Sequence, residues 1–230
     1  MFDLDGPMFD FYAARRPGLE RRAPETARLL EKILIEHDEL LPVLPNPDDP
    51  LALYSAALDS LGDRPRTLRR DALDAALRRC LDDQEMAAAA ESAVPTPGVE
   101  AVLRELHRLG VPLAVTSNNS ADAIRVLLDR TGLLAVFENR VFGRSADHRR
   151  MKPHPDVLER ALGALGAAPR AGLLIGDSEP DVRAAAAIGA AFIGFADSPR
   201  KAERLRTAGA DRVVSSMEEI HEALGRVAVV

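Results

Sequence analysis

Apolar positions from residue 97 onward alternate between two spacings along the chain. Val99, Val102, Leu103 and Leu106 repeat at the spacing of one helix face, and a short apolar run at residues 112–116 follows them. The same pairing of a helical stripe with a short apolar run recurs towards the end of the chain. Helices that alternate with short buried strands are typical of a parallel sheet with crossover helices. The sequence therefore predicts an α/β fold, with strands at residues 112–116, 140–142, 172–175, 191–194 and 212–214.

The pattern differs between residues 24 and 92, where three helical stripes follow one another with no strand pattern between them. The stripes include Leu30, Leu58 and Leu77, and Pro24 and Pro50 stand where first-turn prolines are favoured. We therefore expect a small helical bundle inserted after the first strand. The predicted division is an α/β core of residues 1–14 and 95–230 and a helical cap of residues 15–94.

Composition narrows the class of protein. The chain has 230 residues, of which 47% are hydrophobic, and this is ample for a buried core. Its one cysteine, Cys80, excludes an intramolecular disulfide, and the sequence has neither a signal-peptide pattern nor an apolar run of about 20 residues. The net charge of -6 disfavours a surface for nucleic-acid phosphates. We therefore expect a cytoplasmic protein that binds neither membranes nor nucleic acids.

Three short motifs place polar residues at or near the predicted ends of strands, and a fourth places Lys152 at the start of a predicted helix. Asp3 and Asp5 lie in Phe-Asp-Leu-Asp-Gly, and the other three motifs are Val-Thr-Ser-Asn at 115–118, Met-Lys-Pro at 151–153 and Gly-Asp-Ser-Glu-Pro-Asp at 176–181. An acidic turn or a helix cap would explain any one of them alone. Because the carboxyl ends of parallel strands meet at one edge of a sheet, the motifs at strand ends are expected to meet at a single site.

In this order, and with an inserted helical segment, the motifs resemble the haloacid dehalogenase-like (HAD) hydrolase superfamily, and within it the helical-capped phosphatases similar to phosphoglycolate phosphatase. The resemblance runs over nearly the whole chain. It implies a Rossmann-like parallel sheet as the core, with an inserted α-helical cap. It also implies an enzyme, a Mg2+-dependent phosphatase that hydrolyses a small-molecule phosphomonoester through an aspartyl-phosphate intermediate.

The resemblance makes Asp3 the nucleophile that attacks phosphorus and Asp5 the general acid and base. Side chains alternate along a strand, so carboxylates two residues apart at the end of a strand can address the same pocket. One carboxylate can then attack while the other handles protons. Gly6 is expected to permit the tight turn that follows them.

The second and third motifs are expected to bind the phosphate group. Ser117 would hold phosphate oxygens with help from Asn118, and Thr116 takes this role instead if the register slips by one. Lys152 would neutralise both the phosphate and the nucleophile with a compact charge. Lysine is rare in this chain, with three against 27 arginines, so a lysine in this motif indicates more than a random surface position.

The resemblance also implies a Mg2+ site at the same edge of the sheet. Asp3, the backbone carbonyl of Asp5 and Asp177 would bind the ion, and Asp181 would support them directly or through water. Mg2+ prefers oxygen ligands, a few of them carboxylates.

Two features depart from the family pattern. Pro7 stands where the family usually has threonine, which restricts the backbone of Gly6, and the loop after the nucleophile is expected to shift. Met1 and Phe2 precede Asp3 where related chains carry a longer apolar strand. We therefore expect the central first strand to be truncated, the nucleophile to lie on a frayed end, and the native chain to carry more apolar residues before Phe2.

Other functions remain open at this stage. A phosphomutase belongs to the same superfamily, and a non-catalytic or impaired binding protein would share the fold. The expected partner is a small phosphorylated metabolite, because a cap over the pocket hinders larger substrates. The expected state is a monomer or a homodimer. Arg15 and Arg16, close to the nucleophile in sequence, are weaker candidates for contact with the substrate.

Overall fold

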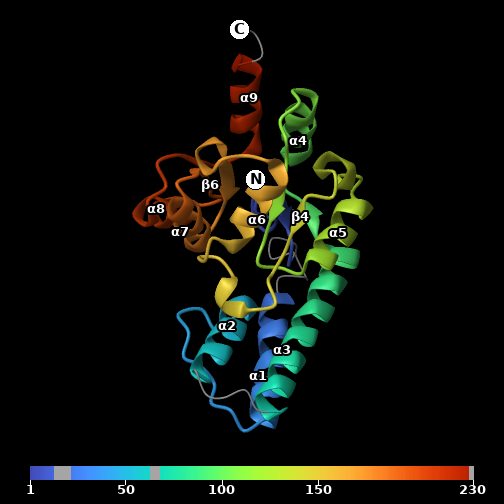
Figure 1. The fold of residues 1–230 in the computed structure, drawn as a ribbon, viewed down its shortest axis with the longest axis vertical. Helices are drawn as coiled ribbons and strands as arrows, with labels where there is room; N and C mark the ends of the chain where they lie inside the picture. Colours follow the sequence, from blue (N-terminus) through green and yellow to red (C-terminus); the bar gives the residue numbers. More distant parts are fainter. Residues whose placement is uncertain (13–21, 63–67, 228–230) are drawn as a thin grey trace.

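A computed structural model describes residues 1–12, 22–62 and 68–227 (Figure 1). An α/β core occupies the upper part of the view in Figure 1, and three helices, α1, α2 and α3, extend below it. The core carries the N-terminal segment near its middle, and helix α9 leads to the C-terminus at the end farthest from the three lower helices.

A parallel sheet forms the middle layer of the core. Its strands are β3 (Val115–Thr116), β4 (Val141–Phe142), β5 (Leu173–Gly176), β6 (Ala191–Phe195) and β7 (Val213–Val214). Strand β3 pairs with β4, and β5, β6 and β7 pair in that order, all of them parallel. Phe2 forms parallel bridges to Val115 on one side and Ile175 on the other, so the N-terminal segment joins the two halves. These strands confirm the predicted α/β fold, although three of them are shorter than the sequence pattern indicated.

Residues 1–3 are hydrogen-bonded to both neighbouring strands. The Met1 carbonyl accepts a bond from Ile175 N at 3.0 Å, and Asp3 N donates to the Ile175 carbonyl at 2.8 Å. On the other side Phe2 N donates to the Ala114 carbonyl at 3.0 Å. The frayed end expected around the nucleophile is therefore wrong, because the free backbone groups of β3 and β5 hold this segment on both edges.

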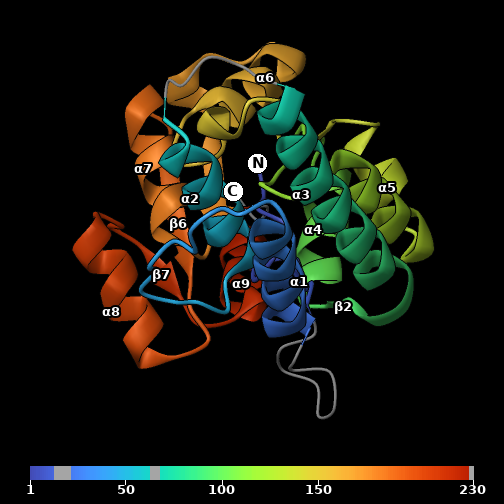
Figure 2. The same ribbon diagram turned by 90° about the horizontal axis from the view of Figure 1, so that it is seen from below.

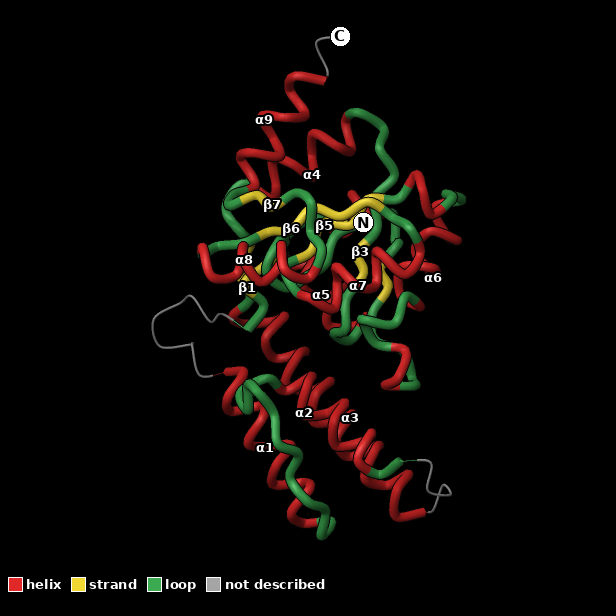
Figure 3. Tube along the Cα trace, turned by 90° about the vertical axis from the view of Figure 1, so that its left-hand side faces the viewer, coloured by secondary structure: helices red, strands yellow, loops and turns green. Residues whose placement is uncertain are grey.

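Helices cover both faces of the sheet (Figure 3). Helices α4 (Val99–Arg108), α5 (Ala121–Arg130) and α9 (Met217–Val227) contribute to one buried cluster, and α6 (Asp156–Leu165) and α7 (Glu179–Ile188) contribute to a second. Helix α8 (Pro199–Ala208) packs against α7. Alternate residues of the strands point to opposite clusters: Phe2, Val115 and Ile175 join the first, and Met1 and Leu174 join the second. This period of two is what a sheet buried on both faces requires.

The three remaining helices form the inserted bundle that the sequence predicted. They are α1 (Arg22–Glu36), α2 (Pro50–Ser60) and α3 (Leu68–Ala87), and Figure 2 views the molecule from their side. Their apolar faces meet in a separate buried cluster that includes Leu30, Leu58 and Leu77. Met151, from a loop of the core, also joins this cluster. The bundle is therefore packed against the core as well as connected to it by the chain.

The two connections between cap and core pair with each other. Strand β1 (Phe9–Asp10) runs antiparallel to β2 (Val94–Pro95). Helix α3 passes into a π-helical turn, η1 (Ala88–Ser92), before it reaches β2. The sequence pattern did not predict this two-stranded connection, because strands of two residues are too short to show a period. The division at residues 14/15 and 94/95 stays a prediction.

Three short 3-10 turns complete the described chain: η2 (Leu134–Phe137), η3 (His148–Arg150) and η4 (Pro169–Ala171). Across the described residues, each helix falls short of the length and apolar content that a bilayer crossing needs.

Candidate functional site

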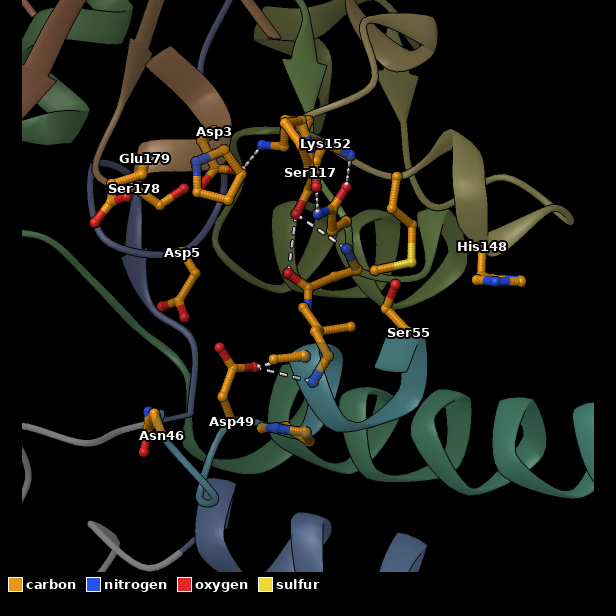
Figure 4. Close-up of a pocket in the computed structure, with 18 of the residues that line it drawn as sticks. Asp3, Asp5, Asn46, Asp49, Ser55, Ser117, His148, Lys152, Ser178 and Glu179 are labelled. Carbon is orange, nitrogen blue, oxygen red and sulfur yellow. Dashed lines mark hydrogen bonds and ion pairs between the residues drawn. The ribbon is translucent and has the colours of Figure 1, made fainter. Parts of the chain in front are cut away.

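A cavity of about 1000 Å3 lies between the carboxyl edge of the sheet and the cap (Figure 4). The loops after β3 and β5 open into it, as does the segment after the central residues 1–3. Helix α2 contributes the facing wall. Most residues that the sequence predicted as functional line this cavity: Asp3, Asp5, Ser117, Asn118, Lys152 and Asp177.

Three carboxylates meet at the sheet edge. Asp3, Asp177 and Asp181 each offer an oxygen, and these oxygens lie within 4.8 Å of one another. Asp3 and Asp181 are buried, and Asp177 is partly buried. Like charges this close are unstable without positive charge beside them. The cluster therefore suits a hard divalent cation that takes oxygen ligands, such as Mg2+.

Lys152 supplies part of the positive charge that this cluster of carboxylates needs. Its Nζ donates to Asp3 Oδ1 at 2.6 Å and to the Thr116 carbonyl at 3.1 Å, and it lies 2.6 Å from Asp181 Oδ1. Burial acts to lower the pKa of Lys152, but Asp181 and Asp3 outweigh it and raise the pKa above its usual value. Lys152 is therefore a permanent cation that links two of the three carboxylates.

Lys201 supplies a second positive charge, and the sequence analysis did not assign it to the site. It stands in the first turn of α8, and its Nζ contacts Asp177 Oδ2. The signal that would have found it is the rarity of lysine: two of the three lysines in the chain contact this cluster of carboxylates. No motif marks it, because α8 reaches Asp177 only through the packing of α8 on α7.

Loss of water raises the pKa of the carboxyl groups at this edge. Burial raises the pKa of Asp3 to about 8, and Asp181 adds to the rise while Lys152 opposes it. Burial likewise raises the pKa of Asp177 to about 7, against the effect of Lys201. The pKa of Asp5 rises to about 6, again through burial, and a hydrogen bond from Phe11 N limits the rise. A carboxyl group with a pKa near 6 can both give and take a proton close to neutral pH.

Asp5 is held by the backbone that follows it. Its Oδ1 accepts a hydrogen bond from Phe11 N at 2.9 Å. The chain turns back through Gly6, whose N donates to the Phe9 carbonyl at 2.7 Å and whose φ is +93°. A Cβ on Gly6 would lie 2.2 Å from Asp177 Oδ2. Glycine is therefore required here both for its backbone conformation and for the close approach of Asp177.

Asp181 lies behind the cavity wall, where it organises the start of α7. Its Oδ2 accepts hydrogen bonds from Ser178 N at 3.1 Å and from Ser178 Oγ at 2.6 Å. Together with the Ser178 cap this forms a capping box. The fourth motif thus starts a helix and also presents Asp177 to the cavity.

The loop after β3 is fixed by its own side chains. Asn118 Oδ1 accepts from Lys152 N at 2.8 Å, and Asn118 Nδ2 donates to the Lys152 carbonyl at 3.1 Å. Ser117 Oγ donates to Asn119 Oδ1 at 2.9 Å. Both residues are buried, but Ser117 lines the cavity, whereas Thr116 lies outside the lining and turns its carbonyl to Lys152. This register favours Ser117 over Thr116 as the residue that meets a ligand.

A buried ion pair joins the cap to this loop. Glu85 of α3 is fully buried; its Oε1 lies 2.8 Å from Arg144 Nη1, and its Oε2 accepts from Ser120 N at 2.6 Å. Asn119 Nδ2 donates to the same carboxylate at 3.2 Å. No sequence pattern predicted this contact, because a glutamate on an amphipathic helix is normally solvated. Two residues far apart in the chain thereby align the cap with the phosphate-binding loop predicted from the sequence.

Arg15 and Arg16, the weaker candidates for substrate contact, lie outside the described residues.

Comparison with known proteins places the chain among characterised folds. A family model described as haloacid dehalogenase-like hydrolase matches residues 1–189. Phosphoglycolate phosphatases are similar over almost the full length: that of Shigella boydii serotype 4 is 27% identical, and that of Escherichia coli strain K12 is 26% identical, with 97% of this chain and 91% of the relative covered in each case.

Solved structures share the fold at lower identity. A predicted phosphatase from Clostridium acetobutylicum has a TM-score of 0.69 at 20% identity and covers 98% of this chain and 96% of its own. CbbY from Rhodobacter sphaeroides, solved in complex with phosphate, has a TM-score of 0.64 at 21% identity, with 95% of this chain and 94% of CbbY covered. These similarities support the arrangement of a Rossmann-like core with a helical cap.

The role of Gly6 can be tested by a matched pair of alanine variants. Gly6→Ala is expected to lower the free energy of unfolding by about 2–4 kcal/mol, because the new Cβ meets Asp177 and the backbone is strained. Gly62→Ala is the control, since Gly62 also has a positive φ, +56°, but open space around its Cβ. It should cost about 1–2 kcal/mol from backbone strain alone. Urea denaturation of both variants measures the difference, and equal losses would show that Asp177 does not constrain Gly6.

Proposed function

Because the chain belongs to the haloacid dehalogenase-like hydrolase family, we propose that it is a phosphatase that hydrolyses a small-molecule phosphomonoester through an aspartyl-phosphate. The observation that carries the proposal is the meeting of Asp3, Asp5 and Lys152 in one cavity with a cluster of carboxylates. Phosphoryl transfer needs a nucleophile, a proton donor for the leaving oxygen and positive charge around the phosphate. These residues supply all three.

The relatives named phosphoglycolate phosphatase support hydrolysis of a phosphate ester. At 26–27% identity they support the reaction type and leave the substrate to be derived from the cavity. The cap covers the cavity with α2, which favours small molecules over macromolecules.

The first step is attack of an Asp3 carboxylate oxygen on phosphorus. A new bond forms between this oxygen and phosphorus as the bond from phosphorus to the ester oxygen breaks. Asp5 then gives its proton to the leaving oxygen, which departs as an alcohol. Lys152, already 2.6 Å from Asp3 Oδ1, balances negative charge on the nucleophile and the phosphate. The backbone and hydroxyl of Ser117 would hold phosphate oxygens, with Asn118 fixing the loop.

The second step releases the phosphate. Asp5, now ionised, takes a proton from water as the water oxygen attacks phosphorus. The bond from phosphorus to Asp3 breaks, and both carboxylates return to their starting states. The elevated pKa of Asp5, about 6, suits a group that must act first as acid and then as base.

The carboxylate cluster fits a divalent cation by charge and by donor type. Asp3, Asp177 and Asp181 carry three negative charges when ionised, and Lys152 and Lys201 carry two positive charges. A bound Mg2+ would offset the remaining negative charge and that of the phosphate, and would draw electron density from the phosphate oxygens. Asp3, the Asp5 carbonyl and Asp177 would hold it, with Asp181 in support. Release of phosphate from a panel of phosphorylated metabolites, with and without Mg2+, tests the proposed function.

The cytoplasmic location and the monomeric or homodimeric state remain predictions from the sequence. No structural feature of the described residues favours a phosphomutase or a non-catalytic protein over the phosphatase.

Asp3→Asn is expected to keep the fold and lose turnover by at least about a thousandfold, because an amide of the same shape cannot attack phosphorus. Steady-state kcat on a substrate that the wild type hydrolyses measures the loss, and circular dichroism checks the fold. A variant with comparable kcat would show that another group is the nucleophile.

Asp5→Asn is expected to slow both steps, most strongly for poor leaving groups, because the variant can neither give nor recover a proton. Rapid acid quenching of the variant with 32P-labelled substrate should trap phosphoenzyme when a good leaving group is used. An unchanged rate on a poor leaving group would rule out the acid-base role.

Lys201→Met is expected to raise the affinity for Mg2+ by about tenfold. The substitution removes the ammonium group that contacts Asp177 and would compete with Mg2+ for this carboxylate. Isothermal titration with Mg2+ and no substrate measures this directly. Lys32→Met is the matched control, since the Lys32 side chain is 73% exposed on the cap. If Lys201→Met weakens Mg2+ binding instead, the lysine positions Asp177 rather than competing for it.

A further inference from the structure

The wall of the cavity that faces the reacting carboxylates is acidic. Residues 46–59 of the cap contribute Asp48, Asp49 and Asp59 to the lining, and this stretch has neither lysine nor arginine. Its other polar contributors include Asn46 and Ser55, which are uncharged. In an attacking geometry the phosphate lies at Asp3, so the organic part of a substrate extends towards this wall.

The cations in the described part of the lining already face carboxylates of the protein. Lys152 contacts Asp3, and Arg204 lies 3.3 Å from Glu179. Arg149 lies 3.2 Å from Asp147. A second anionic group on the substrate would share these cations with the carboxylates that they already pair with, and the acidic wall would repel it.

Asp49 is the carboxylate of this wall that lies opposite Asp5, the proposed proton donor to the leaving group. Its Oδ1 caps α2 and accepts hydrogen bonds from Leu51 N at 3.1 Å and Ala52 N at 3.0 Å. Figure 4 shows its other oxygen turned towards Asp5 across the cavity. Asp5 is the proposed proton donor to the ester oxygen, so Asp49 faces the substrate atoms next to that oxygen.

From these observations we infer that the substrate has no second anionic group and carries a hydroxyl on the carbon adjacent to the one that bears the ester oxygen. Asp49 accepts a hydrogen bond from this hydroxyl. The substrate class is a phosphate monoester of a small polyol or sugar. The inference rests on the proposed phosphatase function and goes further by naming the leaving group. A carboxylate at the same position, as in phosphoglycolate, would face Asp49 at close range and be repelled.

Two substrates that differ at one carbon test this directly. 2-Hydroxyethyl phosphate and 2-phosphoglycolate have the same two-carbon frame, with a hydroxymethyl group in one and a carboxylate in the other. The wild-type protein with Mg2+ is expected to have kcat/KM at least about tenfold higher for 2-hydroxyethyl phosphate, since tenfold corresponds to a modest interaction difference. A preference for 2-phosphoglycolate would overturn the inference, as would a preference for phosphoethanolamine, which carries an ammonium group instead of the hydroxyl.

Asp49→Asn removes the negative charge of Asp49 and is expected to leave the fold intact. Asparagine is as good an N-cap as aspartate, so α2 should be retained, and an unchanged melting temperature checks this. The preference for 2-hydroxyethyl phosphate, measured as its kcat/KM divided by that for 2-phosphoglycolate, is expected to fall by about tenfold in this variant. Asp38→Asn is the matched control, because Asp38 is a cap carboxylate that pairs with Arg69 outside the cavity lining, and it should leave the ratio unchanged. An unchanged ratio in Asp49→Asn would overturn the role of Asp49.

A generic substrate separates failure of this inference from failure of the proposed function. Hydrolysis of p-nitrophenyl phosphate reports phosphatase activity with a leaving group that needs no hydroxyl. If it is hydrolysed while 2-hydroxyethyl phosphate is not, the phosphatase function stands and the inferred leaving group is wrong. If Mg2+ and protein hydrolyse none of these esters, the proposed function fails and the inference fails with it.

Discussion

Negative charge at the carboxyl edge of the sheet is the constraint on which the rest of this structure depends. Asp3, Asp177 and Asp181 bring oxygens within 4.8 Å of one another, and Asp3 and Asp181 are buried. Such a cluster is stable only if positive charge lies against it. Lys152 and Lys201 reach it from different elements, and the negative charge that they leave uncompensated favours a divalent cation. Burial raises the pKa values of Asp3 and Asp177, and the neighbouring carboxylates add to the rise.

Much of the backbone around the site serves to bring these groups together. The first residues lie between β3 and β5, so Asp3 emerges at the middle of the edge and not at its margin. Gly6 lets the chain turn away while Asp177 approaches it. The pairing of β1 with β2 then brings both ends of the cap insertion to the same place. The cap is aligned by a buried contact between Glu85 and Arg144, next to the loop that carries Ser117. A few short-range contacts thus hold the cap in place beside the residues of the candidate site.

The cap also gives the cavity its chemical character. Its wall carries three carboxylates, Asp48, Asp49 and Asp59, whereas the opposite wall carries the residues of the proposed phosphoryl transfer. The helix start at Asp49 combines two roles, since one oxygen caps α2 and the other faces the cavity. Family membership by itself does not fix this wall, because fold and reaction type are set by the core and the leaving group is met by the cap.

The sequence by itself determined the fold class and most of the site. Spacing of apolar residues predicted the alternating strands and helices and the inserted bundle, because burial on one or two faces imposes a period on the residues themselves. Motifs at strand ends brought Asp3, Asp5, Ser117 and Asp177 to one cavity, because the carboxyl ends of parallel strands meet at one edge. Lys152, from the remaining motif, lines the same cavity. Tertiary structure alone decided the contacts between elements with no fixed sequence relation. Lys201 on Asp177, Glu85 on Arg144 and Asp49 opposite Asp5 each depend on how whole helices pack, and a pattern local to one helix does not encode the distance to another.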